Sequence, residues 1–199
     1  MKISEIADIA TGTILTRVKP ASKYDDTEKV PSISMQELSY FSSGKIDEIP
    51  ERSMMTVLSS KKDQCAYAKA NDVLYGLTQF RSMIIQGDFV GRLIPSNFAI
   101  IRIKSKDIDP SYLMWSLNEG PCSKKTISKM IQGTASVKNV SVTVLKNLDL
   151  TPLPPLARQR SIGKLYQMSL RREKIDGTIR KVRNALMINA LNQINNKEN

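Results

Sequence analysis

The sequence predicts an α+β fold in two parts: a mixed α/β domain over residues 1–152, then one long C-terminal α-helix within residues 153–199. Three observations support this prediction. Seven of the nine prolines and seven of the nine glycines lie at or before Pro152, where they divide the chain into short segments. Some of those segments are β-branched or alternating, as strands are. Beyond Pro154-Pro155 the prolines stop, and apolar residues recur at helical spacing as far as Ile194.

The opening segment predicts a short helix over Ser4–Ile9, with Ser4 as its N-cap. Short segments bounded by Pro, Gly or Asn predict strands, of which the last is the clearest: Val30–Met35, Asp72–Leu77 and Phe98–Lys104. A polar loop over Thr78–Ser82 is expected to follow the second strand.

Two helices are predicted after these strands. The first runs over Pro110–Glu119, where Asp109 can cap its start and Gly120-Pro121 can end it. The second covers Lys124–Ile131 and ends at Gly133. Residues 144–148 then lead into an extended segment that reaches Pro152.

The long helix has an apolar stripe that a single helix cannot bury against itself. Steps of four, three and four residues near its middle resemble a coiled-coil seam, so a partner helix is expected. The stretch from residue 153 onward also holds 10 basic and 3 acidic residues. The predicted pairing residues are Ile162, Leu165, Met168, Ile175, Ile179, Val182 and Leu186.

The charge balance indicates a polyanionic partner. The chain has 30 Lys and Arg against 19 Asp and Glu, a net charge of +11, which favours nucleic acid over an anionic membrane surface. A solubility charge without a partner is the alternative. Acidic residues in the first eight positions argue against a signal peptide, and no apolar run has the length of a spanning helix. A cytoplasmic protein with no membrane role is expected.

Catalytic motifs are absent from the sequence. Histidine does not occur, which excludes Ser-His-Asp triads, Cys-His dyads and His-based metal sites. Cys65 and Cys122 are too far apart for a CxxC motif, and no GxGxxG or P-loop is present. The paired acids Asp25-Asp26 and Asp47-Glu48 fit solvated turns better than a Mg²⁺ site. We therefore expect no catalytic residue, no metal and no cofactor on this chain.

A nucleic-acid interface is the stronger hypothesis. Residues 121–148 contain five lysines and no acid, interleaved with short polar side chains that suit phosphate and base contacts. Aromatic residues make up only 6% of the chain, which favours duplex binding over stacking on single strands. For any one residue, a solvated surface position is the alternative. The predicted DNA contacts are Gln79, Arg81, Arg92, Lys124, Lys125, Lys129, Gln132, Thr134 and Lys138.

Several short motifs, in order, resemble the specificity subunits of type I restriction-modification enzymes. Residues 97–103 followed by Asp107–Leu113 are similar to the strand and "(I/D)DPxYL" turn of their target recognition domains. Residues 131–136 resemble the "xxGxTxxx" loop, and residues 140–148 the "ISxxxLKNL" segment. Residues 153–162 match "LPPLxEQxxI", which opens the long conserved helix. The N-terminal residues 3–12 are similar to the opening "LGDIxxxxxG", and residues 13–70 match least.

This resemblance implies a non-catalytic subunit that reads duplex DNA. It also implies a partner methyltransferase that methylates adenine with S-adenosylmethionine, and it leaves room for a restriction nuclease subunit. The chain differs from the family at Arg158, where Glu is usual, and in having one recognition domain and one helix where a full subunit has two of each. We therefore expect a homodimer that pairs its helices antiparallel and reads a gapped inverted repeat.

Two other function classes remain open at this point. A stand-alone DNA-binding regulator would bind a specific site without any methyltransferase. A scaffold or inhibitor would engage a restriction complex through the helix without reading DNA.

Overall fold

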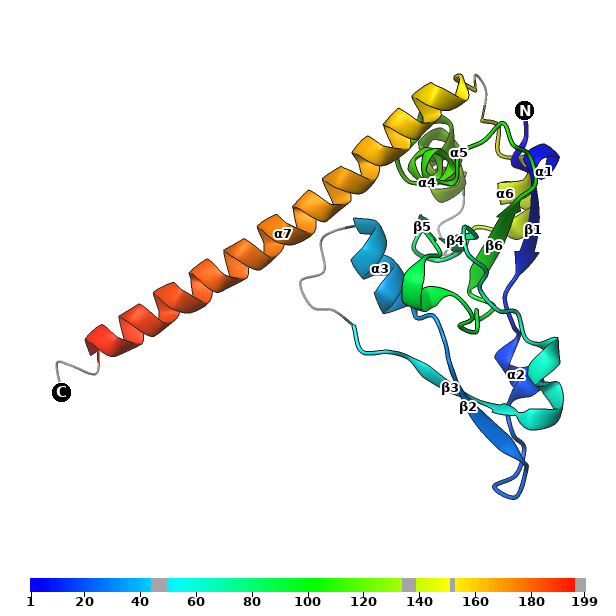
Figure 1. Cartoon of the computed structure of the whole chain (residues 1–199), viewed down its shortest axis with the longest axis horizontal. Coiled ribbons are helices and arrows are strands. Elements are labelled where there is room, and N and C mark those ends of the chain that lie inside the picture. The colour runs from blue at the N-terminus through cyan, green and yellow to red at the C-terminus, as the bar shows by residue number, and fades with distance from the viewer. Residues whose placement is uncertain (44–49, 134–138, 151–152, 196–199) are drawn as a thin grey trace.

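The computed structural model describes residues 1–43, 50–133, 139–150 and 153–195, and for residues 130–133 the backbone alone. A mixed α/β body holds the N-terminus, and the long helix α7 (Leu156–Asn195) packs on it at one end and then extends away from it (Figure 1). Both parts that the sequence predicts are present, so the predicted fold class is confirmed.

The body is built on a four-stranded antiparallel sheet of order β1-β6-β4-β5. Its strands are β1 (Ala7–Thr11), β4 (Val73–Gly76), β5 (Arg81–Ile84) and β6 (Phe98–Ile103). Side chains alternate between its two faces, and both faces are covered. Val73 and Tyr75 join one core with α1 (Ile3–Ile6), α4 (Pro110–Glu119) and α6 (Val142–Asn147). Leu74 and Phe98 join a second core with α3 (Met35–Ser43) on the opposite face.

A smaller antiparallel pair, β2 (Thr27–Pro31) and β3 (Met54–Leu58), packs a third core that includes Val30, Val57 and Leu93. Short helices α2 (Leu15–Val18), η1 (Ser59–Gln64) and η2 (Gly87–Phe89) connect these elements. In the turn before β2, the Asp25 carboxylate accepts hydrogen bonds from two backbone N–H groups, as expected for a turn residue.

Three local predictions need correction. The opening helix ends at Ile6, its N-cap is Lys2 rather than Ser4, and residues 7–11 form β1, which pairs with β6. The strand predicted to reach Met35 ends at Pro31. Helix α3 begins at Met35 because Ser34 and Glu37 cap its start: the Ser34 hydroxyl accepts from the Glu37 N–H, and the Glu37 carboxylate accepts from the Ser34 N–H.

The other predicted helices are confirmed. α4 has the predicted bounds, and its cap Asp109 accepts hydrogen bonds from two backbone N–H groups. α5 (Pro121–Gly133) starts three residues earlier than predicted. α7 has 40 residues, which makes it about 60 Å long at 1.5 Å per residue. Within the described ranges, no helix is long and apolar enough to cross a bilayer.

Candidate nucleic-acid and partner interface

The turn between β4 and β5 brings several predicted DNA-contact residues together. Arg81 lies in β5 rather than in the predicted polar loop, because it pairs with Gly76 in the sheet. Phe80, just before it, has a φ of 55°, a left-handed conformation uncommon outside glycine. The Val140 N–H donates a 2.8 Å hydrogen bond to the Leu77 carbonyl. The chain that follows α5 therefore returns beside this turn.

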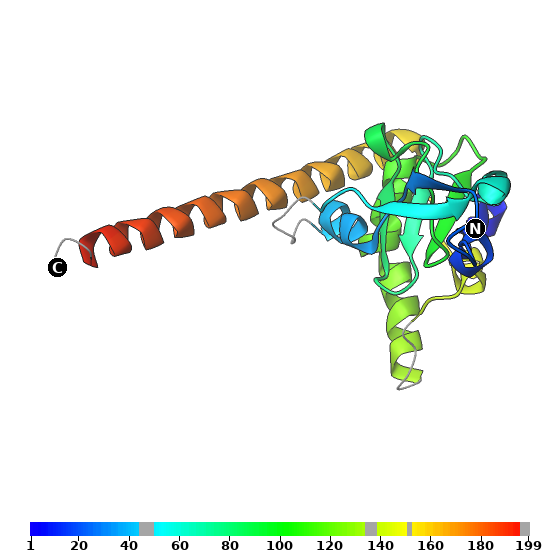
Figure 2. The ribbon, with the colours of Figure 1, turned by 90° about the horizontal axis from the view of Figure 1, so that it is seen from below.

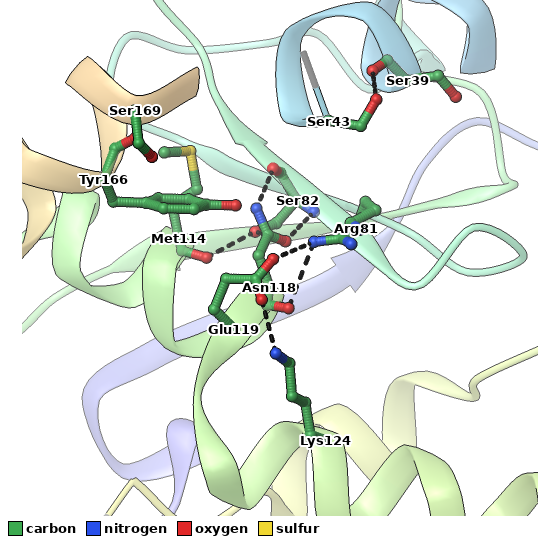
Figure 3. Close-up of polar contacts among 10 residues, drawn as sticks. All are labelled: Ser39, Ser43, Arg81, Ser82, Met114, Asn118, Glu119, Lys124, Tyr166 and Ser169. Atoms are coloured by element: carbon green, nitrogen blue, oxygen red, sulfur yellow. Dashed lines mark hydrogen bonds and ion pairs between the residues drawn. The ribbon is translucent and has the colours of Figure 1, made fainter. Parts of the chain in front are cut away.

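One carboxylate joins two of the predicted DNA-contact cations. Glu119, at the end of α4, accepts a 2.6 Å hydrogen bond from Arg81 through Oε1 and a 2.7 Å hydrogen bond from Lys124 through Oε2 (Figure 3). Burial alone would raise the pKa of the Glu119 carboxyl, but these two cations outweigh burial and lower it. Burial alone would lower the pKa of Arg81, but its contact with Glu119 outweighs burial and raises it. Glu119 therefore holds the side chains of Arg81 and Lys124 close to each other on the surface of the body.

A buried amide places Glu119 beside β5. The Asn118 side chain accepts a 2.6 Å hydrogen bond from the Ser82 N–H and donates a 3.0 Å hydrogen bond to the Ser82 carbonyl. It thereby pairs with the edge of β5 as a neighbouring strand would. Ser82 is completely buried and Asn118 is 5% exposed. Sequence reasoning missed both residues, because nothing local marks a partner 36 positions away.

Helix α5 presents the most accessible predicted cations. Lys125 and Lys129 are exposed and lie one turn apart on the same helical face. The C-terminal half of α5 projects from the body in a direction of its own (Figure 2). The side chain of Gln132 and the whole of Thr134 and Lys138 lie outside the described residues, so these three predicted contacts stay predictions.

Two other predicted contacts are engaged inside the body. Gln79 donates a 3.2 Å hydrogen bond to the Met35 carbonyl. Arg92 is only 6% exposed, and its guanidinium donates a 2.6 Å hydrogen bond to Glu37 and lies 4.5 Å from the centre of the Phe89 ring. Removing Arg92 from this pair would leave a buried charge on Glu37. The burial of Arg92 argues for a structural role and against contact with DNA.

The first turns of α7 are fixed to α4 by a buried glutamine. Gln159 is 1% exposed. Its Oε1 accepts a 3.0 Å hydrogen bond from the Asp109 N–H, and its Nε2 donates 2.8 Å hydrogen bonds to the carbonyls of Asp107 and Pro154. The same residue therefore links the loop before α4, the cap of α4 and the start of α7.

Two further contacts set the direction of α7. At Gly163 the helix approaches α4 so closely that a Cβ would lie 2.5 Å from the Ser111 side chain and 2.8 Å from backbone atoms. Leu170 is 7% exposed, and the helix leaves the body two turns beyond it. Between Gly163 and this point of departure, the Lys174 ammonium lies 4.5 and 4.2 Å from the ring centres of Tyr40 and Phe41 in α3. Burial lowers the pKa of Lys174.

The apolar stripe of α7 faces away from the body over most of its length. Ile162 is the exception, because it packs against the core that α4 shares with the sheet. The other six predicted pairing residues are between 44% and 66% exposed. We call this exposed set the α7 seam: Leu165, Met168, Ile175, Ile179, Val182 and Leu186.

Comparisons with known proteins identify the fold. No family model matches the sequence, and no curated protein matches it. A chain from a structure of a type I R-M (restriction-modification) system, solved for its complex assembly and conformational transition, is 16% identical with a TM-score of 0.62; the match covers 98% of this chain and 48% of that one. The HsdS subunit of Thermoanaerobacter tengcongensis is 17% identical with a TM-score of 0.52, over 89% of this chain and 38% of that one.

This likeness establishes a shared fold. The chain has the fold of a type I R-M specificity subunit and spans about half the length of the structures that it matches. The expected resemblance is therefore confirmed at the level of fold.

Proposed function

We propose that this chain is a non-catalytic DNA sequence-specificity subunit of a type I-like R-M enzyme. Two copies pair through α7, bind duplex DNA at a gapped inverted repeat and direct a partner adenine methyltransferase, which itself binds S-adenosylmethionine. A restriction nuclease subunit completes the assembly where one is present. The observation that carries the proposal is the exposed α7 seam on a chain that superposes, almost entire, on half of a specificity-subunit fold.

The seam explains why two copies are needed. Six large apolar side chains lie on one side of α7, turned away from the body that the helix belongs to. A second helix with the same stripe is the simplest surface that covers them. A two-fold axis between two such helices relates the two bodies, so each reads the same half-site in opposite orientation.

DNA attraction is assigned mainly to α5. Lys125 and Lys129 are exposed, and no acidic residue occurs in the helix. We expect the double substitution of Lys125 and Lys129 by Ala to weaken binding to every sequence and to lower the salt slope by about 2. Lys106→Ala is the matched control, because Lys106 is exposed at the opposite end of α4 from α5. Equal slopes for both variants would refute the assignment.

The decisive test is genome-wide adenine methylation in cells that hold the partner methyltransferase, with and without this chain. A gapped palindromic motif that requires the chain is the expected result. A gapped but asymmetric motif would retain the specificity role and exclude the homodimer. Unchanged methylation in cells that express the chain would refute the specificity role; tight, salt-sensitive binding of one DNA site by the purified chain would then favour a regulator, and its absence a scaffold.

A further inference from the structure

The last turns of α7 are apolar on more than one side. Met187 and Ile194 are 63% and 59% exposed, and both lie on a flank of the helix beside the α7 seam. Each residue advances the helix by about 100°, which places Met187 about 100° and Ile194 about 80° round from Leu186 in the same sense. A helix pair held by the seam alone leaves this flank in water.

An apolar groove lies at the other end of α7. It has a volume of about 350 Å³ and lies beside the first turns of α7, against α4. We call it the base groove; its lining includes Tyr112, Trp115, Leu153, Pro154, Arg158 and Ile162.

We propose that the base groove of each copy receives the distal flank of α7 from a second copy of this chain. This inference rests on the homodimer in the proposed function and adds a second contact, which fixes the register of the pair. Three features identify the occupant of the base groove. They are the arrangement of apolar residues along the α7 seam, the position along the helix pair that each helix end reaches, and the side of the helix on which each apolar flank lies.

Four of the six residues of the α7 seam are placed symmetrically about Gly177. Met168 and Leu186 lie nine residues on either side of it, and Ile175 and Ile179 lie two residues on either side. An antiparallel pair with its two-fold axis beside Gly177 therefore sets Met168 against Leu186 and Ile175 against Ile179 of the other copy. Apolar side chains then meet apolar side chains at each of these levels.

This register brings the distal end of one helix to the base groove of the other. Ile194 lies 17 residues beyond Gly177, so it stands level with residue 160 of the second copy. Arg158 and Ile162, which line the groove, lie on either side of that level. The distal flank of one copy and the base groove of the other copy therefore lie at the same level along the helix pair.

The flanks also agree. Ile162 lies about 120° round the axis of α7 from Met168. Met187 and Ile194 are displaced from Leu186 in that same direction of rotation. In an antiparallel pair, the same flank of each helix lies on the same side. The apolar flank of each distal end thus faces a groove that is lined mainly by apolar and aromatic side chains.

Cysteine cross-linking of the full chain tests the contact. Arg158→Cys with Ile194→Cys, in a Cys122→Ser background, places the thiols 36 residues apart on one helix, about 54 Å. That distance allows a short cross-link only between two copies. Arg158→Cys with Asn192→Cys is the matched control, because residue 192 lies at nearly the same level and projects from the other side. We expect the first pair to form covalent dimers at least about tenfold faster than the control.

Thr178→Cys, next to the two-fold axis, separates failure of the groove from failure of the dimer. Self-cross-linking at residue 178 with equal rates for the two test pairs would overturn groove docking and retain the antiparallel dimer. No cross-link at residue 178 and a monomer in sedimentation would overturn both. In a binding assay, Ile194→Asp should weaken dimerisation at least about tenfold, and Asn192→Asp less than about twofold.

Discussion

Replacing Gln159 by Glu tests whether the buried hydrogen bonds at the base of α7 hold the helix on the body. The Oε1 atom accepts from the Asp109 N–H, and a carboxylate oxygen can do the same. The Nε2 atom donates to the carbonyls of Asp107 and Pro154 at 2.8 Å. An ionised carboxylate has no hydrogen to donate, so it would face two carbonyl oxygens in a site that is 1% exposed.

The free energy needed to protonate the new carboxyl limits how much the free energy of unfolding can fall. An unfolded Glu has a pKa of about 4.3, so protonating it at pH 7 costs about 1.36 × 2.7, or about 3.7 kcal/mol. The protonated form can donate to one carbonyl, and losing the other hydrogen bond costs about 1 kcal/mol. The free energy of unfolding should therefore fall by up to about 5 kcal/mol at pH 7 and by about 1 kcal/mol at pH 4.

The direction of the pH dependence distinguishes this mechanism from a general loss of packing. The folded pKa of the carboxyl introduced by Gln159→Glu is raised, so the lost stability returns below the unfolded pKa and disappears as the pH rises toward the folded pKa. Urea unfolding followed by the fluorescence of Trp115, the single tryptophan, measures the difference from the parent chain at each pH. Gln193→Glu is the control, since Gln193 is exposed on the same helix. A pH-independent loss at Gln159, or a cost no greater than the control's, would refute the argument.

Three further substitutions test the packing around α7 and α3. Gly163→Ala should lower the free energy of unfolding by about 1–3 kcal/mol, because the new Cβ meets the α4 backbone and outweighs the higher helix propensity of Ala; thermal unfolding measures it, and a gain in stability would contradict the close approach. Arg92→Met should cost about 3–5 kcal/mol in urea, because Glu37 keeps a buried charge, and the double variant with Glu37→Leu should recover most of that loss; no recovery would contradict the buried pair. Burial holds the pKa of Lys174 below its usual 10.5, so the free energy of unfolding should rise with pH between the lowered pKa and 10.5. Urea unfolding at a series of pH values measures this rise, and Lys174→Met should abolish it. An unchanged pH profile in Lys174→Met would exclude Lys174 as the source of the rise.

Elements with local signals were predictable from the sequence. α4 has an Asp cap, a proline in its first turn and a glycine at its end, and each acts within a few residues of the helix. β1 has no such signal. Residues 7–9 continue the pattern of the short opening helix, and they become a strand because β6, more than 90 residues away in the chain, provides the pairing edge.

The candidate site was harder to predict, because long-range contacts decide which charges are free. Arg81 and Arg92 look alike in the sequence, because nothing close to either of them marks an acidic partner. The fold brings Arg92 to Glu37, 55 positions away, and buries both. It brings Arg81 to Glu119, 38 positions away, and leaves both about one-third exposed. Lys125 stays exposed, as its basic, acid-free segment predicts.

Helix α7 reverses the usual relation between hydropathy and burial, and this reversal is the strongest argument for a partner. Its buried residues are Gln159, Gly163, Leu170 and Gly177, three of which are glycine or polar, whereas the six residues of the α7 seam are exposed. Fully burying a large apolar side chain is worth about 1.5–3 kcal/mol, so the seam offers on the order of 10 kcal/mol per copy. Association costs about 4–15 kcal/mol in lost freedom. Two seams can offset that cost, which is why a second α7 suffices to hold the proposed pair and a contact at the base groove sets its register.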